Sequence, residues 1–188
     1  MIHLYLARHG ETTENVNRIL QGHLPGHLTD NGKAQAVILR EELVKSHIPF
    51  DCLVVSDLQR TLDTAHIINE VLSLPLYTTP LLRERDWGSV TGISLAEKPI
   101  DVFPDDVESI EALFNRARRF LDYLLLHFDG QTLLAIGHGL FNRCILATVA
   151  GKTIQDIPRM NNAEIREIQL NHTILSSLKS SDVIADNQ

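Results

Sequence analysis

The sequence predicts an α/β domain with a mostly parallel central sheet. Short apolar runs alternate with longer amphipathic stretches along most of the 188 residues, which is the pattern of strands joined by crossover helices. No internal repeat and no Gly/Ser-rich or Pro-rich linker divides the chain. We therefore expect one domain over residues 1–175, followed by a polar C-terminal tail over residues 176–188.

The predicted strands are short runs dominated by Leu, Ile and Val. The first run, from Ile2 to Ala7, is predicted to be buried on both faces, as strands of a parallel sheet usually are. A stretch without clean periodicity, from Pro80 to Pro104, is predicted to be a long functional loop. The expected strands cover residues 2–7, 53–55, 76–78, 132–136 and 165–170.

Two of the predicted helices begin after residues that favour N-caps. Thr29 caps a helix that runs to about Ser46, and the pair Ser56-Asp57 can cap one that runs to about Leu72. Apolar residues recur at helical spacing in each, so one face of each helix should pack inward. These inward faces are expected to hold Ala34, Val37, Ile38 and Leu43 in the first helix, and Leu58, Leu62, Ala65, Ile68 and Leu72 in the second.

The third predicted helix, from about Asp106 to Phe128, has the clearest amphipathic pattern in the chain. A fourth follows residues 137–139 and ends at Gly151, since Gly is a favoured C-cap. In the third helix a run of three leucines leaves one of them, Leu126, outside the inward stripe, which allows a weak homodimer contact. That stripe is expected to hold Ile110, Leu113, Phe114, Ala117, Leu121, Leu124, Leu125 and Phe128.

The composition excludes several classes of protein. Hydrophobic residues make up 44% of the chain and charged residues 22%, as in globular proteins. The net charge of −7 argues against nucleic-acid binding, which needs a basic face. The N-terminus does not resemble a signal peptide, and no apolar run reaches the roughly 20 residues of a membrane span. Because Cys52 and Cys144 lie among apolar neighbours, we expect buried free thiols and a cytoplasmic protein.

Polar side chains suited to a phosphate group follow three of the predicted strands. The first strand leads into Arg8 and His9, the second leads to Arg60, and the fourth leads into His138 and Gly139. Ligands of open α/β sheets bind beyond the carboxyl ends of the strands, where these residues should meet. Guanidinium groups match phosphate oxygens, and glycine beside each histidine lets backbone N–H groups come close.

Two imidazoles at such an edge point to covalent catalysis. A histidine nucleophile needs an unprotonated ring nitrogen aimed at phosphorus and a hydrogen bond that fixes its tautomer. The leaving oxygen then needs a proton, which a carboxylic acid can supply. Glu84 in the irregular loop is the candidate donor, with Glu11 and Asp86 as rivals. His23 and His27 have a spacing that suggests a metal site, but no carboxylate or thiol set accompanies them in the sequence, so we expect solvated histidines.

The order and spacing of four short motifs resemble the histidine phosphatase superfamily, the phosphoglycerate-mutase-like proteins, over Ile2 to Leu170. Two departures affect the expected substrate rim: His27 stands where the family often has Pro, and residues 87–92 lack the aromatic-Glu pair of many of its phosphatases. The matching motifs are Leu6-Ala7-Arg8-His9-Gly10-Glu11-Thr12 with Asn15, Leu28-Thr29-Asp30-Asn31-Gly32 with Gln35-Ala36, Ser56-Asp57-Leu58-Gln59-Arg60-Thr61 with Thr64-Ala65, and Gly137-His138-Gly139.

The resemblance implies a three-layer α/β/α sandwich and a histidine-type acid phosphatase that hydrolyses small phosphomonoesters without metal or cofactor. It implies that His9 is phosphorylated and that Glu84 donates the proton. It also implies that Arg8, Asn15, Arg60 and His138 bind the phosphate.

Two other functions remain open. A mutase would return the phosphoryl group to another hydroxyl of the same molecule, but the segment over residues 93–107 is short for a lid that excludes water. A non-catalytic phospholigand-binding module would lack a catalytic residue, and none is missing.

Overall fold

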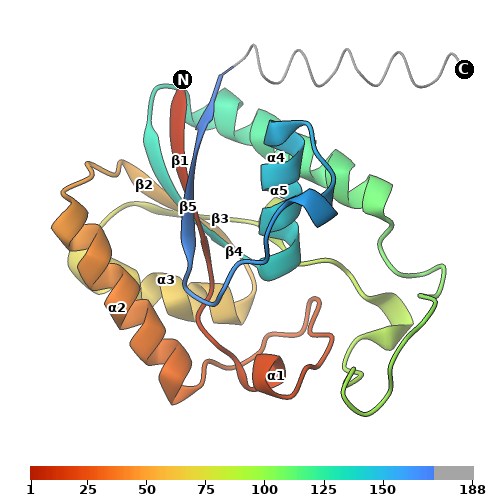
Figure 1. The fold of residues 1–188 in the computed structure, drawn as a ribbon. Helices are drawn as coiled ribbons and strands as arrows, with labels where there is room; N and C mark the ends of the chain where they lie inside the picture. The colour runs from red at the N-terminus through yellow and green to blue at the C-terminus, as the bar shows by residue number, and fades with distance from the viewer. Residues whose placement is uncertain (172–188) are drawn as a thin grey trace, which may run out of the picture.

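The computed structural model describes residues 1–171, which form a five-stranded sheet between two layers of helices (Figure 1). The strand order is β3-β2-β4-β1-β5; neighbours among the first four strands are parallel, and β5 is antiparallel to β1. The predicted fold class is therefore confirmed, whereas the predicted tail over residues 176–188 lies outside the described range. The strands are β1 (Ile2–Arg8), β2 (Cys52–Ser56), β3 (Leu76–Thr79), β4 (Thr132–Gly137) and β5 (Ile165–Leu170).

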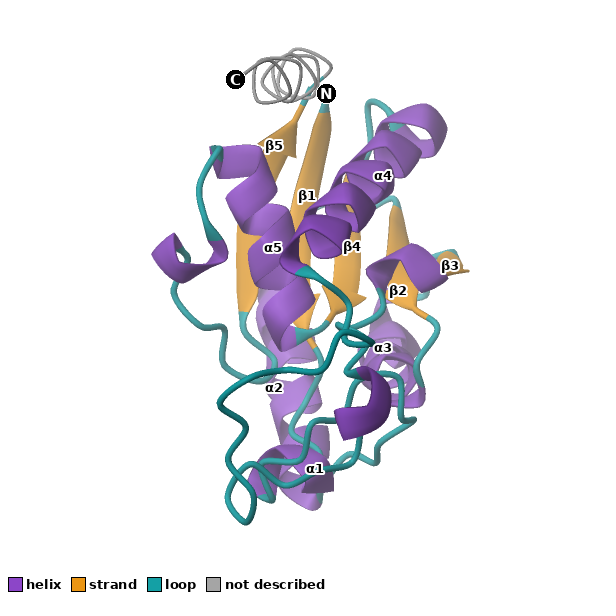
Figure 2. Cartoon of the chain, turned by 90° about the vertical axis from the view of Figure 1, so that its right-hand side faces the viewer, coloured by secondary structure: helices purple, strands orange, loops and turns teal. Residues whose placement is uncertain are grey.

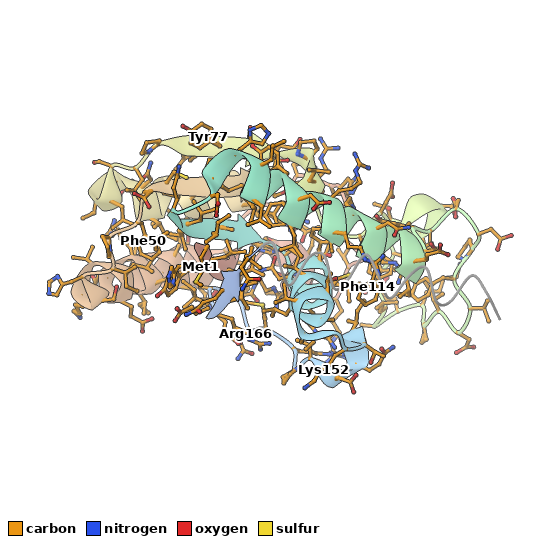
Figure 3. All side chains as sticks on the ribbon, turned by 90° about the horizontal axis from the view of Figure 1, so that it is seen from above. Met1, Phe50, Tyr77, Phe114, Lys152 and Arg166 are labelled. Atoms are coloured by element: carbon orange, nitrogen blue, oxygen red, sulfur yellow. The ribbon has the colours of Figure 1, made fainter. Side chains whose placement is uncertain are left out.

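The helices cover the two faces of the sheet in pairs. Helices α2 (Asp30–Ser46) and α3 (Gln59–Leu72) lie on one face, and α4 (Ile110–Phe128) and α5 (Gly139–Ala150) lie on the other (Figures 1 and 3). None of the helices within residues 1–171 is long and apolar enough to cross a membrane. The short elements are α1 (Thr13–Val16) and the 3₁₀ turns η1 (Pro80–Leu82), η2 (Gly88–Val90) and η3 (Ile154–Asp156).

The sheet separates two hydrophobic clusters, which fix its position between the helix layers. On one face Leu4 and Leu6 of β1 pack with residues of α4 and α5, and on the other face Ala7 packs with residues of α2 and α3. Cys52 and Cys144 are buried free thiols, as predicted, and burial raises the pKa of Cys144 to about 12. Both cysteines are therefore packing residues.

Helix α2 has the predicted bounds, but of its predicted inward face only Leu43 is buried and Val37 is half-buried. The prediction that Ala34 and Ile38 point inward was wrong, since Ala34 is exposed and the side chain of Ile38 is 56% exposed. The reason lies in the first turn, where Gly32 packs so closely on Glu11 that a Cβ atom would lie 2.0 Å from the Glu11 carbonyl oxygen. That contact sets the rotation of the helix. The buried stripe is Gly32, Ala36, Leu39 and Leu43.

Two predicted helix starts were also wrong. Helix α3 begins at Gln59 without a side-chain cap, because the Ser56 hydroxyl pairs with a histidine and the Asp57 carboxylate pairs with Arg83. Helix α4 begins after Ser109, four residues later than expected, because the Asp106 carboxylate instead accepts hydrogen bonds from the backbone and hydroxyl of Ser89.

Candidate active site

Three adjacent parallel strands, β1, β2 and β4, deliver their carboxyl ends to the same edge of the sheet (Figure 2). Strand β1 ends at Arg8 and leads directly into His9, and β4 leads directly into His138. Arg60 lies in the first turn of α3, just after β2. The rings of His9 and His138 are 5.3 Å apart between centroids. The strand ends therefore bring together the two imidazoles and two guanidiniums that the sequence predicted to meet.

His9 is a buried imidazole with a defined tautomer. Its Nδ1 lies 2.7 Å from the carbonyl oxygen of Gly10, and because a carbonyl oxygen only accepts, Nδ1 carries the proton. Nε2 is left with its lone pair. Burial, together with the charges of Arg60 and Arg8, holds the pKa of His9 well below its ordinary range. His9 is therefore neutral near neutral pH, with an unprotonated Nε2.

His138 has the same tautomer as His9, with its proton on Nδ1. Its Nε2 lies 2.8 Å from the hydroxyl oxygen of Ser56, which also accepts the N–H of Leu58 at 3.4 Å. The acceptor for the Ser56 hydroxyl proton among residues 1–171 is His138 Nε2, so the imidazole proton sits on Nδ1. Nδ1 is buried without a hydrogen-bond partner within those residues. Burial, with Arg60 and His9, holds the pKa of His138 well below its ordinary range, so the ring is a neutral N–H donor.

Arg8 and Arg60 are anchored to backbone carbonyls through terminal nitrogens, and Arg60 uses both of them, since its Nη1 also donates to the Leu24 carbonyl. Arg8 Nη1 donates to the Met160 carbonyl at 2.7 Å, and Arg60 Nη2 donates to the Gly22 carbonyl at 2.8 Å. The Nε atoms of both arginines are buried and lack a partner in the described part of the chain. Burial lowers the pKa of Arg60 to about 10, which leaves it charged at neutral pH. Each guanidinium therefore keeps hydrogen-bonding capacity for an anion.

Glu84 lines a cavity together with Arg8, and its carboxylate is fixed at the start of α5. Oε2 accepts the N–H of Leu140 at 3.1 Å, and Oε1 accepts the N–H groups of Phe141 at 3.0 Å and Arg85 at 2.9 Å. The charge of Glu84 acts on Arg8, where it opposes the lowering of the arginine pKa by burial. The helix N-terminus thus positions the carboxylate near Arg8.

The two rival carboxylates are used elsewhere. Glu11 Oε1 accepts the hydroxyl of Thr29 at 2.8 Å, at the start of α2. Asp86 Oδ1 accepts the N–H of Gly88 at 2.9 Å in an exposed turn. Glu84 borders a cavity together with Arg8, whereas Asp86 borders another cavity.

Glycine at two positions of this edge allows close contact between segments. A Cβ atom on Gly139 would lie 3.1 Å from Nε of Arg8, so a larger residue would crowd the guanidinium. A Cβ atom on Gly10 would lie 2.4 Å from the carbonyl oxygen of Gly32, so the residue after His9 must be glycine for β1 to approach α2.

Asn15 is placed at the site by a neighbouring asparagine that the sequence reasoning missed. The Asn15 side-chain oxygen accepts the N–H of Thr12 at 3.2 Å and the amide of Asn162 at 3.0 Å. Asn162 also donates to the carbonyl of His9 at 3.1 Å. It precedes β5 and lies far from the other motifs in sequence, so the signal was only an Asn-Asn pair in a loop.

Arg116 and Gln21 are two further residues missed from the sequence. Arg116 lies 3.8 Å above the ring of Phe141 and donates to the backbone carbonyls of Arg83, at 2.6 Å, and Glu84, at 3.3 Å. It therefore holds the acid-bearing loop against α4. Gln21 is 6% exposed and accepts the hydroxyl of Thr12 at 3.3 Å. Its only sequence signal was a glutamine before Gly22.

The histidines with metal-like spacing do not form a metal site. His23 Nε2 lies 3.0 Å from the backbone carbonyl of Glu84, to which it donates, and His27 is exposed. Within residues 1–171, no group of three or more His, Cys, Asp or Glu side chains is placed to hold a metal ion.

Comparison with known proteins agrees with this arrangement of strands and motifs. A Bacillus subtilis protein named "Uncharacterized phosphatase PhoE" is 30% identical over 183 residues, which cover 94% of this chain and 88% of that protein. A Serratia proteamaculans protein named "Probable phosphoglycerate mutase GpmB" is 32% identical over 170 residues, covering 80% and 76%. The structure of a mycobacterial glucosyl-3-phosphoglycerate phosphatase with VO3 is similar, with a TM-score of 0.79, 25% identity and coverage of 89% and 92%.

The family model described as histidine phosphatase superfamily (branch 1) matches residues 4–179. This range includes both histidines, Arg8, Arg60 and Glu84. The chain belongs to the histidine phosphatase superfamily, whose members act on phosphate esters.

Proposed function

We propose that the protein is a histidine-type acid phosphatase, which hydrolyses small phosphomonoesters without a metal ion through a phosphohistidine on His9. The observation that carries this proposal is the set of buried N–H donors around the His9 ring. Nε of Arg8, Nε of Arg60 and Nδ1 of His138 lack partners within the described residues. Because buried donors are normally paired, a phosphoryl group that accepts from all three accounts for their arrangement.

The first half-reaction begins with attack of His9 Nε2 on phosphorus. The new N–P bond forms as the bond from phosphorus to the alcohol oxygen breaks, and Glu84 gives that oxygen its proton. Arg8, Arg60 and His138 meet the charge that develops on the phosphoryl oxygens, with the Asn15 amide N–H₂ beside them. Arg8 and Arg60 supply the positive charge that a metal ion would otherwise provide, and His138 and Asn15 add neutral N–H donors.

The second half-reaction returns the enzyme to its starting state. Water attacks phosphorus, the N–P bond breaks, and the Glu84 carboxylate takes the proton of the water. A carboxylate has about four lone-pair positions, and three N–H groups occupy three of them in Glu84. The fourth belongs to Oε2, which accepts only from Leu140 within residues 1–171. We assign Oε2 as the atom that carries the proton.

The choice of hydrolysis over phosphoryl transfer is supported by the loop beside the site. Ile93, Ile100 and Val107 pack with Leu20 and Trp87 in a small cluster of their own. The segment over residues 93–107 is therefore packed against the neighbouring loops that carry Leu20 and Trp87, where it forms a short rim. A short rim admits water to the phosphohistidine.

A trapping experiment separates this function from its alternatives. The wild-type protein, treated with EDTA, is mixed with p-nitrophenyl phosphate and quenched in base, and the position of phosphate is read by mass spectrometry. We expect phosphate on His9 and a loss of kcat of at least about 10³-fold in a folded His9→Ala variant. No phosphohistidine and no turnover would identify a binding module. With a phosphorylated diol as substrate, an isomeric phosphate ester in place of inorganic phosphate would identify a mutase.

A further inference from the structure

A cavity of about 310 Å³ opens beside the phosphate-binding residues. Arg8 and Glu84 line the part that it shares with the site, and Arg143, Arg159 and Met160 line the rest. The first turn of α5, at residues 139–140, completes the lining. Its volume suits a small molecule.

The proposed chemistry requires the alcohol part of the substrate to occupy this cavity. The leaving oxygen must face the proton donor, and a general acid works only within hydrogen-bond reach of that oxygen. Glu84 lines the cavity, so the group attached to the leaving oxygen extends into the same space. The rest of the lining, Arg143, Arg159 and Met160, therefore contacts the part of the substrate that distinguishes one ester from another.

The segment that carries Arg159 and Met160 is held in place by guanidinium groups. Arg143 donates to the carbonyls of Ile154, at 2.6 Å, and Ile157, at 2.9 Å. Arg166, which is labelled on β5 in Figure 3, donates to the carbonyl of Arg159 at 3.0 Å. Since Arg8 also donates to the Met160 carbonyl, the backbone around Arg159 is fixed at several points. The fold therefore fixes the backbone from which the exposed Arg159 side chain extends.

The lining of the cavity carries more positive than negative charge. The cavity has three arginines, Arg8, Arg143 and Arg159, and one carboxylate, Glu84, whose oxygens already accept three backbone N–H groups. Burial and the charges of Arg159 and Arg166 lower the pKa of Arg143. The side chain of Arg159 makes no hydrogen bond or ion pair with the rest of residues 1–171. Such a concentration of cations in a chain of net charge −7 favours a ligand with a further negative charge.

We propose that the substrate is a phosphomonoester whose alcohol part carries a second anionic group, a carboxylate or a second phosphoryl group, bound in this cavity by Arg159 with Arg143. This inference rests on the proposed phosphatase activity and names its substrate class. Arg143 uses two donors on the backbone, so Arg159 provides the free fork for the anion.

The test compares substrates that differ only in the second anion. 3-Phosphoglycerate and glycerol 3-phosphate differ by a carboxylate in place of a hydroxymethyl group. Propane-1,3-diol bisphosphate and propane-1,3-diol monophosphate differ by a second phosphoryl group. We expect kcat/KM to be at least about tenfold higher for the substrate that carries the second anionic group, in one of the two pairs. The pair that shows this preference identifies the anion that the cavity binds.

The matched variants are Arg159→Gln and Arg119→Gln, the latter an exposed arginine on α4 that does not line the cavity. Arg159→Gln should abolish the preference by raising KM for the substrate with the second anionic group, with p-nitrophenyl phosphate turnover unchanged. Arg119→Gln should preserve the preference. Equal kcat/KM within both pairs, or equal losses on all substrates in Arg159→Gln, would overturn the inference. Failure of the wild type to hydrolyse any ester, p-nitrophenyl phosphate included, would instead count against the proposed function.

Discussion

Glu84 offers two carboxylate oxygens to three backbone N–H groups, and this geometry decides what a substitution there should do. In Glu84→Gln the amide oxygen can still accept from the first turn of α5, but the amide cannot donate an acidic proton. The rate of alkyl phosphate hydrolysis should fall by about 10²–10⁴-fold, the usual contribution of a general acid. The rate on p-nitrophenyl phosphate should fall much less, because p-nitrophenolate leaves with little assistance.

Steady-state kcat on the two substrates checks this assignment. Glu11→Gln is the matched control, since the Glu11 carboxylate pairs with Thr29, and its two rates should fall by similar factors. Equal losses on both substrates in Glu84→Gln would remove Glu84 from the acid role and direct attention to Asp86.

Individual site residues could be predicted where a motif keeps them beside a strand end. His9 follows β1 directly and His138 follows β4 directly, so topology alone places them together. Asn162 could not be predicted in this way, because its role depends on a loop that returns to His9 from the far end of the chain. The same holds for Arg116, whose side chain reaches the Glu84 loop from the middle of α4. Long-range hydrogen bonds of this kind have no local sequence pattern.

At the scale of the element, helix α4 supports the acid-bearing loop as well as the core. Its inward stripe is buried against the sheet, including Leu113 and Leu121, which are both fully buried. Replacing either with Ala leaves a cavity in a close-packed interior and should lower the free energy of unfolding by about 2–5 kcal/mol. Urea unfolding followed by far-UV circular dichroism measures this change.

Leu126 on the same helix provides the control, because its side chain is 78% exposed. Leu126→Ala should change the free energy of unfolding by less than about 0.5 kcal/mol. A change well under 1 kcal/mol in both core variants would show that these leucines are not packed as described. Whether Leu126 contributes to a homodimer stays a prediction.

The contrast between α4 and α2 shows when a helix face can be predicted from sequence. In α4 the apolar residues lie on one face and the charged residues on the other, so a single rotation of the helix buries the apolar stripe. Two residues differ from the prediction: Ile110 is 46% exposed, and Phe120 is fully buried. In α2 small and apolar residues occur on several faces. Its rotation is set by the contact of Gly32 with Glu11, which depends on tertiary packing and carries no periodicity.

At the scale of the whole molecule, a net charge of −7 coexists with a site edge rich in arginine. Four arginines, Arg8, Arg60, Arg143 and Arg159, come from β1, α3, α5 and the segment before β5. The net charge of the sequence therefore describes the average surface and not the electrostatic potential of one cleft. The charge of a cleft depends on which residues the fold brings together. The cytoplasmic location stays a prediction from composition.

The stability of the whole molecule should depend on pH because the two site imidazoles are buried as neutral groups. Burial comes first among the causes that hold the pKa of His9 and of His138 well below the ordinary range, followed by the nearby charge of Arg60. As the pH falls through about 6.5, both imidazoles take up protons in the unfolded chain, whereas they stay neutral in the folded protein. Acidification therefore favours the unfolded state. The stabilisation is fully present above about pH 6.5 and is lost as the pH falls toward the folded-state values.

Each imidazole should lower the free energy of unfolding by up to about 1.4 kcal/mol per pH unit below about pH 6.5. The window from about pH 6.5 to 5 isolates them, because carboxylates with lowered pKa values, such as Asp57 and Glu164, matter only at more acidic pH. Urea unfolding across this window should give the steepest slope for the wild type, a shallower slope for His9→Asn or His138→Asn, and the smallest for the double variant. A wild-type slope no steeper than that of the double variant would mean that the folded protein protonates these rings, and His9 would then lack the free lone pair that a nucleophile requires.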